Sequence, residues 1–548
     1  MKRFSSLLLF VLVMLVSAAS GQQAQSTADS DPVLQAMLAE MERSKAKLKL
    51  EQVSAPYYID YRVTDMEEMI ADAAFGALRG EIQTRVRVLR VSVRIGDYKQ
   101  DSFYREGEGV TEFMPLDNDV IAMRHQIWLA TDKAYKAAAE ALTAKQAALK
   151  QFNVEQPVDD FAKVTPLQSI APPAKLDLDP RPWEQMLQHA LAVYRDDSMI
   201  QGIDAQMRFE AVTQYFLNSE GTVVRRGHND YGLSLAMTTQ AADGMRLDRS
   251  HAYVVGNLKE LPSEREFLDK ANDLAASLRQ LREAPIVDDE YRGPVLFSAD
   301  AASNIFADLV GQNVLGVKPP LGQPARTRGA WATSYKSRVL PDFISVVDDP
   351  TVATANAHSL LGHYAVDDEG VKAEKVEVVE NGKLMNFVLG RMPIRDFPNS
   401  NGHGRGRLPA TPPEPSLGNL IVRSSEALPV SELKGKLIEI CKQRELPFGY
   451  YVETLGPRLG PRLIYRIYVK DGHQELVRGA TFGDLDTRAI RNDLIAAGND
   501  VNVDNRVLNI PHSIVNPSIL FDELQVKRAN ANKEKLPEYP APPLSSGK

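Results

Sequence analysis

The sequence predicts an α+β protein of two domains, with mixed and antiparallel β-sheets and flanking helices. Segments of alternating apolar and polar residues predict half-buried strands, and separate segments with helical spacing predict helices. Their order does not fit the regular strand–helix alternation of a doubly wound parallel sheet. The length of 548 residues is also too great for one ordinary core, which is why two domains are expected.

The beginning of the chain predicts export. Lys2 and Arg3 precede an apolar run at residues 7–16, and small residues follow at 17–21. This pattern is typical of a secretory signal peptide, so we expect residues 1–21 to be removed and the protein to be periplasmic or secreted. The run is shorter than the roughly 20 residues that span a bilayer, and no later segment is apolar enough to do so. A retained anchor is the alternative.

Residues 22–285 form the predicted N-terminal α+β domain, with a helical insertion near residues 119–150. The insertion lacks Gly and Pro, so we expect one long helix or a helical hairpin. Residues 85–95 alternate as a half-buried strand, in which Leu89 breaks the register as a bulge would. Ser263 and Glu266 have capping-box spacing at the start of a helix over residues 263–282. The remaining predictions are helices at 31–50 and 182–194 and strands at 57–63, 207–217, 222–226 and 232–239.

The segment at residues 284–292, with a proline and several acidic residues, marks the predicted boundary to a C-terminal domain at residues 286–530. Residues 531–548 are rich in proline and predict a disordered tail. Within the C-terminal domain we predict strands at 294–297, 374–379, 384–389 and 462–469, and helices at 301–315, 429–445 and 489–496.

Composition excludes several classes of function. The net charge of −8 argues against a nucleic-acid partner, which needs a basic face. The single cysteine, Cys441, excludes an intrachain disulfide and a multi-cysteine metal site. The sequence also lacks a phosphate-binding loop, a nucleophile elbow and an H-E-x-x-H helix.

Several short sequence motifs occur in a fixed order, and the ordered set indicates a protein family more specifically than any single motif does. The set comprises Asn-Ser-Glu-Gly at 218–221, Val-Asp-Asp-Pro at 347–350, Asp-Asp-Glu-Gly-Val at 367–371, Val-Glu-Asn-Gly-Lys-Leu at 379–384, Arg391, Ser-Asn-Gly-His-Gly-Arg at 400–405, Pro-Ser-Leu-Gly-Asn-Leu at 415–420, Arg-Gly-Ala at 478–480 and Pro-Ser-Ile-Leu-Phe-Asp-Glu-Leu at 517–524. Together they resemble the TldD/PmbA family of metallopeptidase-like proteins, best over residues 291–528. The resemblance implies a TldD/PmbA-like fold.

The resemblance also implies where a metal would bind. The catalytic TldD type carries H-E-x-x-x-H on a helix, and a distant cysteine completes its zinc site, with the Glu as general base. The matching residues here are Ala307, Asp308 and Gln312, so both imidazoles are missing. No cysteine lies near His512, and Cys441 lies some 70 residues earlier. The chain is therefore closer to the PmbA (TldE) type, and no cofactor is expected.

A relocated metal site is an alternative. His358 and His363 have the same five-residue separation, which on an ideal α-helix puts the rings about 140° apart, so their convergence needs a break at Gly362. A carboxylate from residues 367–369, with His512 as a further candidate, would complete a zinc site. Ordinary loop histidines and an acidic turn are the simpler interpretation.

Asn401, His403 and Arg405 lie in a glycine-rich segment and are candidates for the wall of a peptide groove. A turn beside solvated arginines is the alternative.

We therefore expect a non-catalytic subunit that forms a peptide-binding groove or chamber with a catalytic TldD-type partner in proteolysis. Unfolded peptides would add as a strand to a sheet edge, and the protein would be a homo- or hetero-oligomer. The alternatives are an active metallopeptidase with the relocated site, and an exported scaffold or binding protein. No nucleic acid and no membrane span after signal cleavage are expected.

Overall fold

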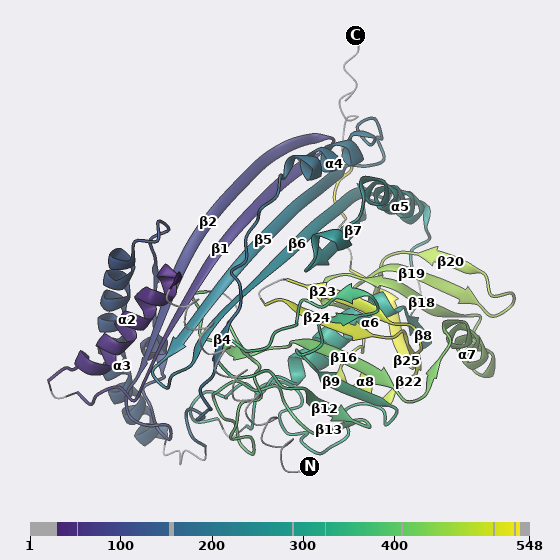
Figure 1. Cartoon of the computed structure of the whole chain (residues 1–548). Helices are drawn as coiled ribbons and strands as arrows, with labels where there is room; N and C mark the ends of the chain where they lie inside the picture. The colour runs from purple at the N-terminus through teal and green to yellow at the C-terminus, as the bar shows by residue number, and fades with distance from the viewer. Residues whose placement is uncertain are drawn as a thin grey trace, which may run out of the picture.

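The computed structural model describes residues 30–51, 53–152, 158–287, 290–323, 325–406, 409–507, 510–530 and 533–537. The predicted signal peptide and residues 538–548 of the predicted tail lie outside these ranges. Figure 1 shows a long, curved sheet that arches over a second, more compact body formed by the later part of the chain. None of the helices in the described ranges has the length and apolar character needed to cross a membrane.

The curved sheet has seven strands in the order β3-β2-β1-β5-β6-β4, and β7 pairs with β6 on the same side as β4. The β1–β2 hairpin turns at Phe75 and Gly76, which both have positive φ, as a two-residue hairpin loop requires. The strands are β1 (Tyr58–Ala74), β2 (Ala77–Arg94), β3 (Val110–Phe113), β4 (Gln168–Ile170), β5 (Gly202–Asn218), β6 (Val223–Gln240) and β7 (Arg246–Val255).

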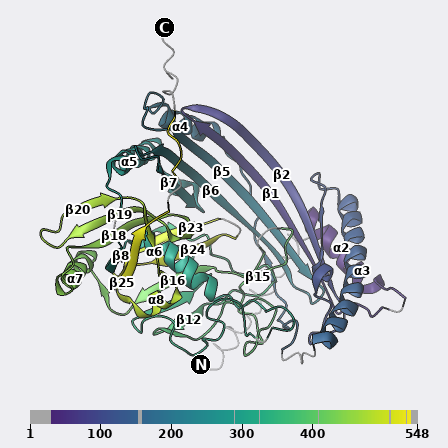
Figure 2. The same ribbon diagram turned by 180° about the vertical axis from the view of Figure 1, so that it is seen from behind.

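Four helices cover one face of this sheet, two at each end. Odd-numbered side chains such as Tyr61 and Val63 pack against α2 (Pro32–Lys47) and α3 (Val120–Phe152), and Met69 and Phe209 pack against α4 (Arg181–Ala192) and α5 (Glu264–Glu283). Figures 1 and 2 show the two helix pairs at opposite ends of the arch. Because neighbouring strand residues point to opposite faces, the even-numbered side chains face the other way, where Phe216 and Val224 contact Val366 of the compact body.

The compact body contains a six-stranded and an eight-stranded sheet, with the largest apolar core between them. The six-stranded sheet has the order β13-β12-β9-β16-β24-β23, and the eight-stranded sheet has β17-β22-β25-β8-β18-β19-β20 with β21 beside β25. Their strands are β8 (Tyr291–Phe297), β9 (Ile344–Asp348), β12 (Val376–Glu380), β13 (Lys383–Leu384), β16 (Asn419–Ser424), β17 (Ala427–Leu428), β18 (Phe448–Leu455), β19 (Pro461–Tyr468), β20 (Gln474–Val477), β21 (Ala480–Phe482), β22 (Leu494–Gly498), β23 (Asn502–Arg506), β24 (His512–Asn516) and β25 (Ile519–Arg528).

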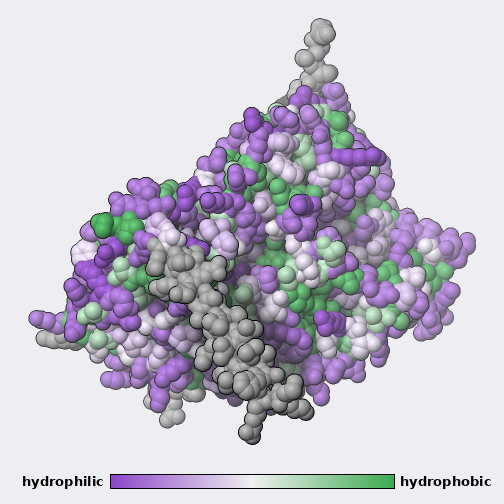
Figure 3. Space-filling model, in the orientation of Figure 1, coloured by the Kyte–Doolittle hydropathy of each residue, from purple (hydrophilic) through white to green (hydrophobic). Residues whose placement is uncertain are grey.

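Short elements complete this body. They are two small hairpins, β10 (Thr354–Ala355) with β11 (His358–Ser359) and β14 (Gly404–Arg405) with β15 (Glu414–Pro415), and the helices α6 (Ala299–Ile305), α7 (Val430–Gln443) and α8 (Thr487–Asn492). Polar side chains dominate the face of the molecule in Figure 3, where apolar residues gather only in smaller patches. Polar surface and internal apolar clusters are what burial of the apolar sheet faces predicts.

The predicted α+β class with mixed and antiparallel sheets is confirmed, but several elements differ from expectation. The predicted bulge at Leu89 is wrong: pairing is regular there, Leu89 is fully buried, and the irregularity lies at Asp72 and Ala73 of β1. The predicted strands at 222–226 and 232–239 form one continuous strand, β6, and the predicted strand at 57–63 continues to Ala74. Charged residues interrupt the apolar alternation within β1 and β6, so the sequence pattern did not show the full length of these strands.

Differences in the compact body have tertiary causes. The helix predicted at 489–496 ends at Asn492, and Leu494 begins β22, which is buried beside β25. The strand predicted at 384–389 extends only to Leu384. In the predicted tail, Lys533 pairs with Met245 and the Glu534 amide donates to the Gly244 carbonyl, so these residues are docked on the first domain's sheet.

Candidate functional site

Residues 307–312, which the resemblance pairs with the metal motif of the TldD type, follow directly after α6. Ser298 caps this helix, and its hydroxyl accepts a hydrogen bond from the Ala301 amide at 3.1 Å. After Ile305 the backbone widens into a π-turn, Phe306–Val310, in which the Gly311 amide donates to the Phe306 carbonyl. In such a π-turn, the amide of one residue donates to the carbonyl five residues earlier, so these two residues lie one turn apart. Ala307 lies within this π-turn, whereas Gln312 lies just after it, in the 3₁₀ turn Gly311–Asn313.

The side chains at this π-turn do not fit a zinc ion. Ala307 is buried and offers only a methyl group, and Gln312 is exposed. Asp308 is exposed as well, although partial burial raises the pKa of its carboxyl above the ordinary value. Neither residue at the two histidine positions provides the imidazole nitrogen that zinc prefers. No step through a metal is derived at this position.

An arginine reaches the motif helix from the neighbouring sheet. Arg506, at the end of β23, donates from Nη2 to Asn304 Oδ1 at 3.1 Å, one helical turn before Asp308. The same guanidinium is held by Asp504 Oδ2, 2.8 Å from Nε. Its positive charge acts against the burial that raises the Asp308 pKa. A cationic side chain, held by its own carboxylate, thus acts on Asp308.

The arched sheet contributes charged side chains on its other face. On β6, Arg226, His228 and Asp230 occupy alternate positions and therefore share one face. Arg226 donates to the Val366 carbonyl at 2.5 Å and pairs with Asp368, both in the compact body. A hydrogen bond and an ion pair therefore join this face of the arched sheet to the compact body.

Burial shifts the pKa values of titratable side chains between the arched sheet and the compact body. Burial, with the Arg226 and Arg405 charges, lowers the pKa of His228 to about 3, although 35% of its side-chain surface remains exposed. Burial and the Glu210 charge raise the pKa of Asp230 to about 7. Burial also lowers the pKa of His512, with a further contribution from Arg506. At neutral pH these imidazoles are neutral hydrogen-bonding groups.

The acidic segment at 367–369 forms a buried turn. Asp367 accepts hydrogen bonds from the amides of Glu369, Val371 and Gly404 at 2.8–2.9 Å. Burial and the neighbouring Glu369 charge nevertheless raise the pKa of Asp367 to about 8. Glu369 accepts from the Arg391 amide at 2.5 Å. These carboxylates therefore bind backbone amides, partly within their own turn and partly in the segments around Arg391 and Gly404.

The three residues proposed for a peptide groove lie mostly inside the molecule. The His403 side chain is fully buried, with Nε2 3.0 Å from Asp348 Oδ1 and Nδ1 3.0 Å from Asn401 Oδ1. Asn401 in turn binds the backbone of residues 387 and 389. Arg405 donates to the Pro511 carbonyl at 2.6 Å, and its guanidinium lies 4.6 Å from the Tyr364 ring centre. His403 therefore cannot line a groove in this conformation, because it has no exposed surface.

The alternative metal ligands are not brought together. His358 is exposed on the β10–β11 hairpin, and Nδ1 of His363 lies 2.9 Å from the Pro350 carbonyl. Nδ1 of His512 faces its neighbour, the Ile510 carbonyl, at 2.8 Å, and Cys441 is buried in the core beneath α7. Across the described ranges no group of three His, Cys, Asp or Glu side chains is placed to hold a metal ion. The residues thus do not fit the relocated zinc site.

Comparison with known proteins finds a family match in the compact body. Residues 290–528 match the model of the PmbA/TldA metallopeptidase C-terminal domain. This part of the chain is therefore similar to the C-terminal domain of PmbA/TldD-type metallopeptidases. A metalloprotease of Methanocaldococcus jannaschii is 32% identical over 106 residues, which are 19% of this chain and 19% of that protein. The chain thus aligns with less than a fifth of the length of this curated relative.

Solved structures share the fold of the whole PmbA/TldD-like chain. A protein from Thermotoga maritima, described as a proposed modulator of a DNA gyrase, has a TM-score of 0.59 at 15% identity, covering 89% of this chain and 99% of its own. TldE from Thermococcus kodakarensis has a TM-score of 0.58 at 13% identity, covering 90% and 100%. A protein from Bacteroides thetaiotaomicron with the same gyrase description has a TM-score of 0.57 at 12% identity, covering 90% and 98%. At these identities the likeness concerns the fold.

The sequence did not predict the charged residues that surround α6 and line the other face of β6. Arg506, His228 and Asp230 were not among the candidates, although the Arg-Gly-His-Asn-Asp run at 226–230 places polar residues at every second position. Such alternation on a strand could have indicated a polar face directed at a second domain.

Proposed function

We propose that this chain is a non-catalytic PmbA/TldD-family subunit that binds extended peptides and assembles with a zinc-bearing catalytic relative in proteolysis. The observation that carries the proposal is the π-turn at the end of α6. Ala307 in this turn and Gln312 just after it stand at the positions that the resemblance assigns to the two histidines, and Arg506 binds Asn304 one helical turn before Asp308. A hydrolytic zinc site needs neutral imidazole or thiolate ligands with a general base, and this position supplies a methyl group, an amide and a cation instead.

The peptide-binding part of the proposal rests on a sheet edge near the motif helix. β23 is the outer strand of the six-stranded sheet, and within the described part of the chain its backbone pairs with β24 alone. Extended peptides bind such edges through backbone hydrogen bonds, which tolerate many side chains. β7 of the arched sheet lies beside β23, where the Asn505 side chain donates to the Val254 carbonyl, and would line the other side of the bound peptide.

The proposal includes export, with removal of residues 1–21. Mass spectrometry of protein isolated from its native host would detect a new N-terminus after Ala19 or Gly21. A full-length chain in the cytoplasm would contradict this part of the proposal and remove the reason to look for an exported partner.

The decisive experiment compares this protein alone with the same protein co-expressed with a paralogue that has an intact H-E-x-x-x-H. We expect no stoichiometric zinc and no peptidase activity from the protein alone, and a stable, larger, active complex with the paralogue. The matched variant combines Ala307→His, Asp308→Glu and Gln312→His, and it should stay inactive because the third ligand is still absent. One zinc per chain that is lost in His358→Ala or His363→Ala would instead establish the relocated-site peptidase. A protein that binds neither a paralogue nor an unfolded peptide would leave the scaffold interpretation.

A further inference from the structure

A pocket of about 250 Å³ lies on the arched sheet, on the face that carries α2 and α3. All of its lining residues fall between Ser30 and Arg225, so it contains no part of the PmbA/TldD C-terminal domain. Its floor is made by paired strand residues that share one face of the sheet: Asp65 with Arg87 and Thr213, Glu67 with Arg85 and Ala211, and Tyr215 with Arg225.

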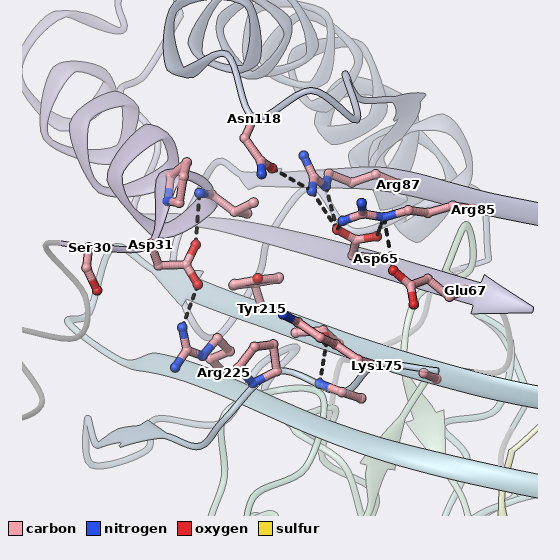
Figure 4. A pocket seen from close by; sticks show the side chains of 16 residues that line it. Ser30, Asp31, Asp65, Glu67, Arg85, Arg87, Asn118, Lys175, Tyr215 and Arg225 are labelled. Atoms are coloured by element: carbon pink, nitrogen blue, oxygen red, sulfur yellow. Dashed lines mark hydrogen bonds and ion pairs between the residues drawn. The ribbon is translucent and has the colours of Figure 1, made fainter. Parts of the chain in front are cut away.

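Tyr215 is the unusual member of this lining. The residue is only 6% exposed, yet its hydroxyl makes no hydrogen bond with any described residue. Figure 4 shows it between two ion pairs, Asp31 with Arg225 and Asp65 with the arginines of β2. Burial, and then the Asp31 charge, raise the pKa of this hydroxyl well above its usual value, so it keeps its proton and is a donor. The hydroxyl is therefore a donor that lines the pocket, has no partner in the described part of the chain and is open to a ligand.

The acidic residues of the pocket are already engaged. Asp65 accepts from Arg85 at 2.9 and 3.0 Å and from Arg87 at 2.6 and 2.9 Å. Asp31 accepts from Arg225 at 2.5 Å and caps α2 through the Val33 and Leu34 amides. Glu67 accepts from the Leu176 amide at 3.3 Å.

Several donors, in contrast, remain free. Nη1 of Arg85, Nη2 of Arg225 and Nζ of Lys175 have no hydrogen-bond partner among the described residues, and all three side chains line the pocket. Together with Tyr215 they form a set of unused donors around one small space. Such a set favours an anionic acceptor, and planar guanidinium groups suit a carboxylate.

We propose that this pocket binds a small organic carboxylate, supplied by a free amino acid or by the C-terminus of a peptide. The lining contains one more cationic than acidic side chain, which suits a monoanion better than a phosphate dianion. The volume fits a ligand of amino-acid size and is below the usual range for larger cofactors. The site goes beyond the proposed function, because it does not depend on the metal motif or on a catalytic partner.

Isothermal titration calorimetry of the full chain tests the proposal, with sodium acetate, glycine, glycylglycine and inorganic phosphate as probes. We expect saturable binding of acetate, with phosphate weaker. The tighter of glycine and glycylglycine identifies the source of the carboxylate. Tyr215→Phe removes only the hydroxyl and should weaken carboxylate binding about tenfold, as loss of a hydrogen bond to a charged group does. Lys175→Gln should weaken it as well.

Tyr253→Phe is the matched control, because Tyr253 lies on β7 outside the pocket. It should bind every probe as the unaltered protein does. Thermal unfolding of each variant shows that the fold is retained. No saturable binding of any carboxylate to the unaltered protein would overturn the proposal. Equal binding by Tyr215→Phe, or phosphate binding tighter than acetate, would overturn it too.

Discussion

The guanidinium of Arg391 lies 2.9 and 3.0 Å from the two carboxylate oxygens of Glu220. Arg391 belongs to the compact body and is fully buried, whereas Glu220 follows β5 of the arched sheet. The same guanidinium donates to the Ala162 carbonyl and lies 4.0 Å from the Phe161 ring centre. This one side chain therefore joins three segments that are far apart in the sequence.

Glu220→Ala is expected to destabilise the protein by about 3–5 kcal/mol, because it leaves the Arg391 charge buried without its carboxylate. Chemical denaturation measures the loss. The exposed pair of Arg488 and Asp486 is the control, and Asp486→Asn should cost about 1 kcal/mol or less. If both variants lose the same small amount, Arg391 is not the buried link between the two parts.

Arg506→Ala is expected to raise the pKa of Asp308 further, because the cation that opposes the effect of burial is removed. Carboxyl-detected NMR titration measures this pKa directly. Arg488→Ala, in an exposed pair whose charges do not act on Asp308, should leave it unchanged. An Asp308 pKa that ignores Arg506 would remove that residue from the motif site.

Asp230 is expected to make the free energy of unfolding fall as the pH rises from about 4 to 7. Its pKa is about 7 in the folded protein and 3.8 ordinarily, so the folded state binds the proton more tightly over this window. The difference in unfolding free energy between the unaltered protein and Asp230→Asn should therefore decrease with pH, by up to about 4 kcal/mol. Denaturation at several pH values measures it.

For His228 we expect the opposite pH dependence of the unfolding free energy. The pKa of His228 is about 3 when folded and 6.5 ordinarily, so the folded state resists protonation. The difference between the unaltered protein and His228→Asn should increase as the pH rises from about 3 to 6.5. If the unfolding free energy differences of Asp230→Asn and His228→Asn changed with pH in the same direction, the pKa shifts of Asp230 and His228 would be contradicted.

Ser263→Ala is expected to cost about 1 kcal/mol of stability through loss of the cap of α5. The Ser263 hydroxyl accepts from the Glu266 amide, and Glu266 accepts from the Ser263 amide at 2.8 Å. Ser263→Asp keeps an acceptor at this position and should retain most of the stability, which thermal unfolding can compare. Equal losses in both variants would contradict a capping role.

The sequence by itself determined the features that depend on local spacing. The capping box at Ser263, the long helix α3 and the α+β class all follow from periodicity and short-range hydrogen bonds, and they are present. The absence of imidazoles at Ala307 and Gln312 is likewise a property of the sequence. The ordered phrases were sufficient to predict the resemblance to the family over the C-terminal part of the chain.

Only the tertiary structure decided how the candidate residues are used. His403, chosen for a groove, meets Asp348 in the interior, and Asp367 binds backbone amides 2 to 37 residues away along the chain. The π-turn after Ile305 and the approach of Arg506 to Asn304 depend on packing between α6 and β23, which no local pattern encodes. Burial and long-range pairing fix the exposure and charge of a side chain, and both are set by segments that meet only after folding.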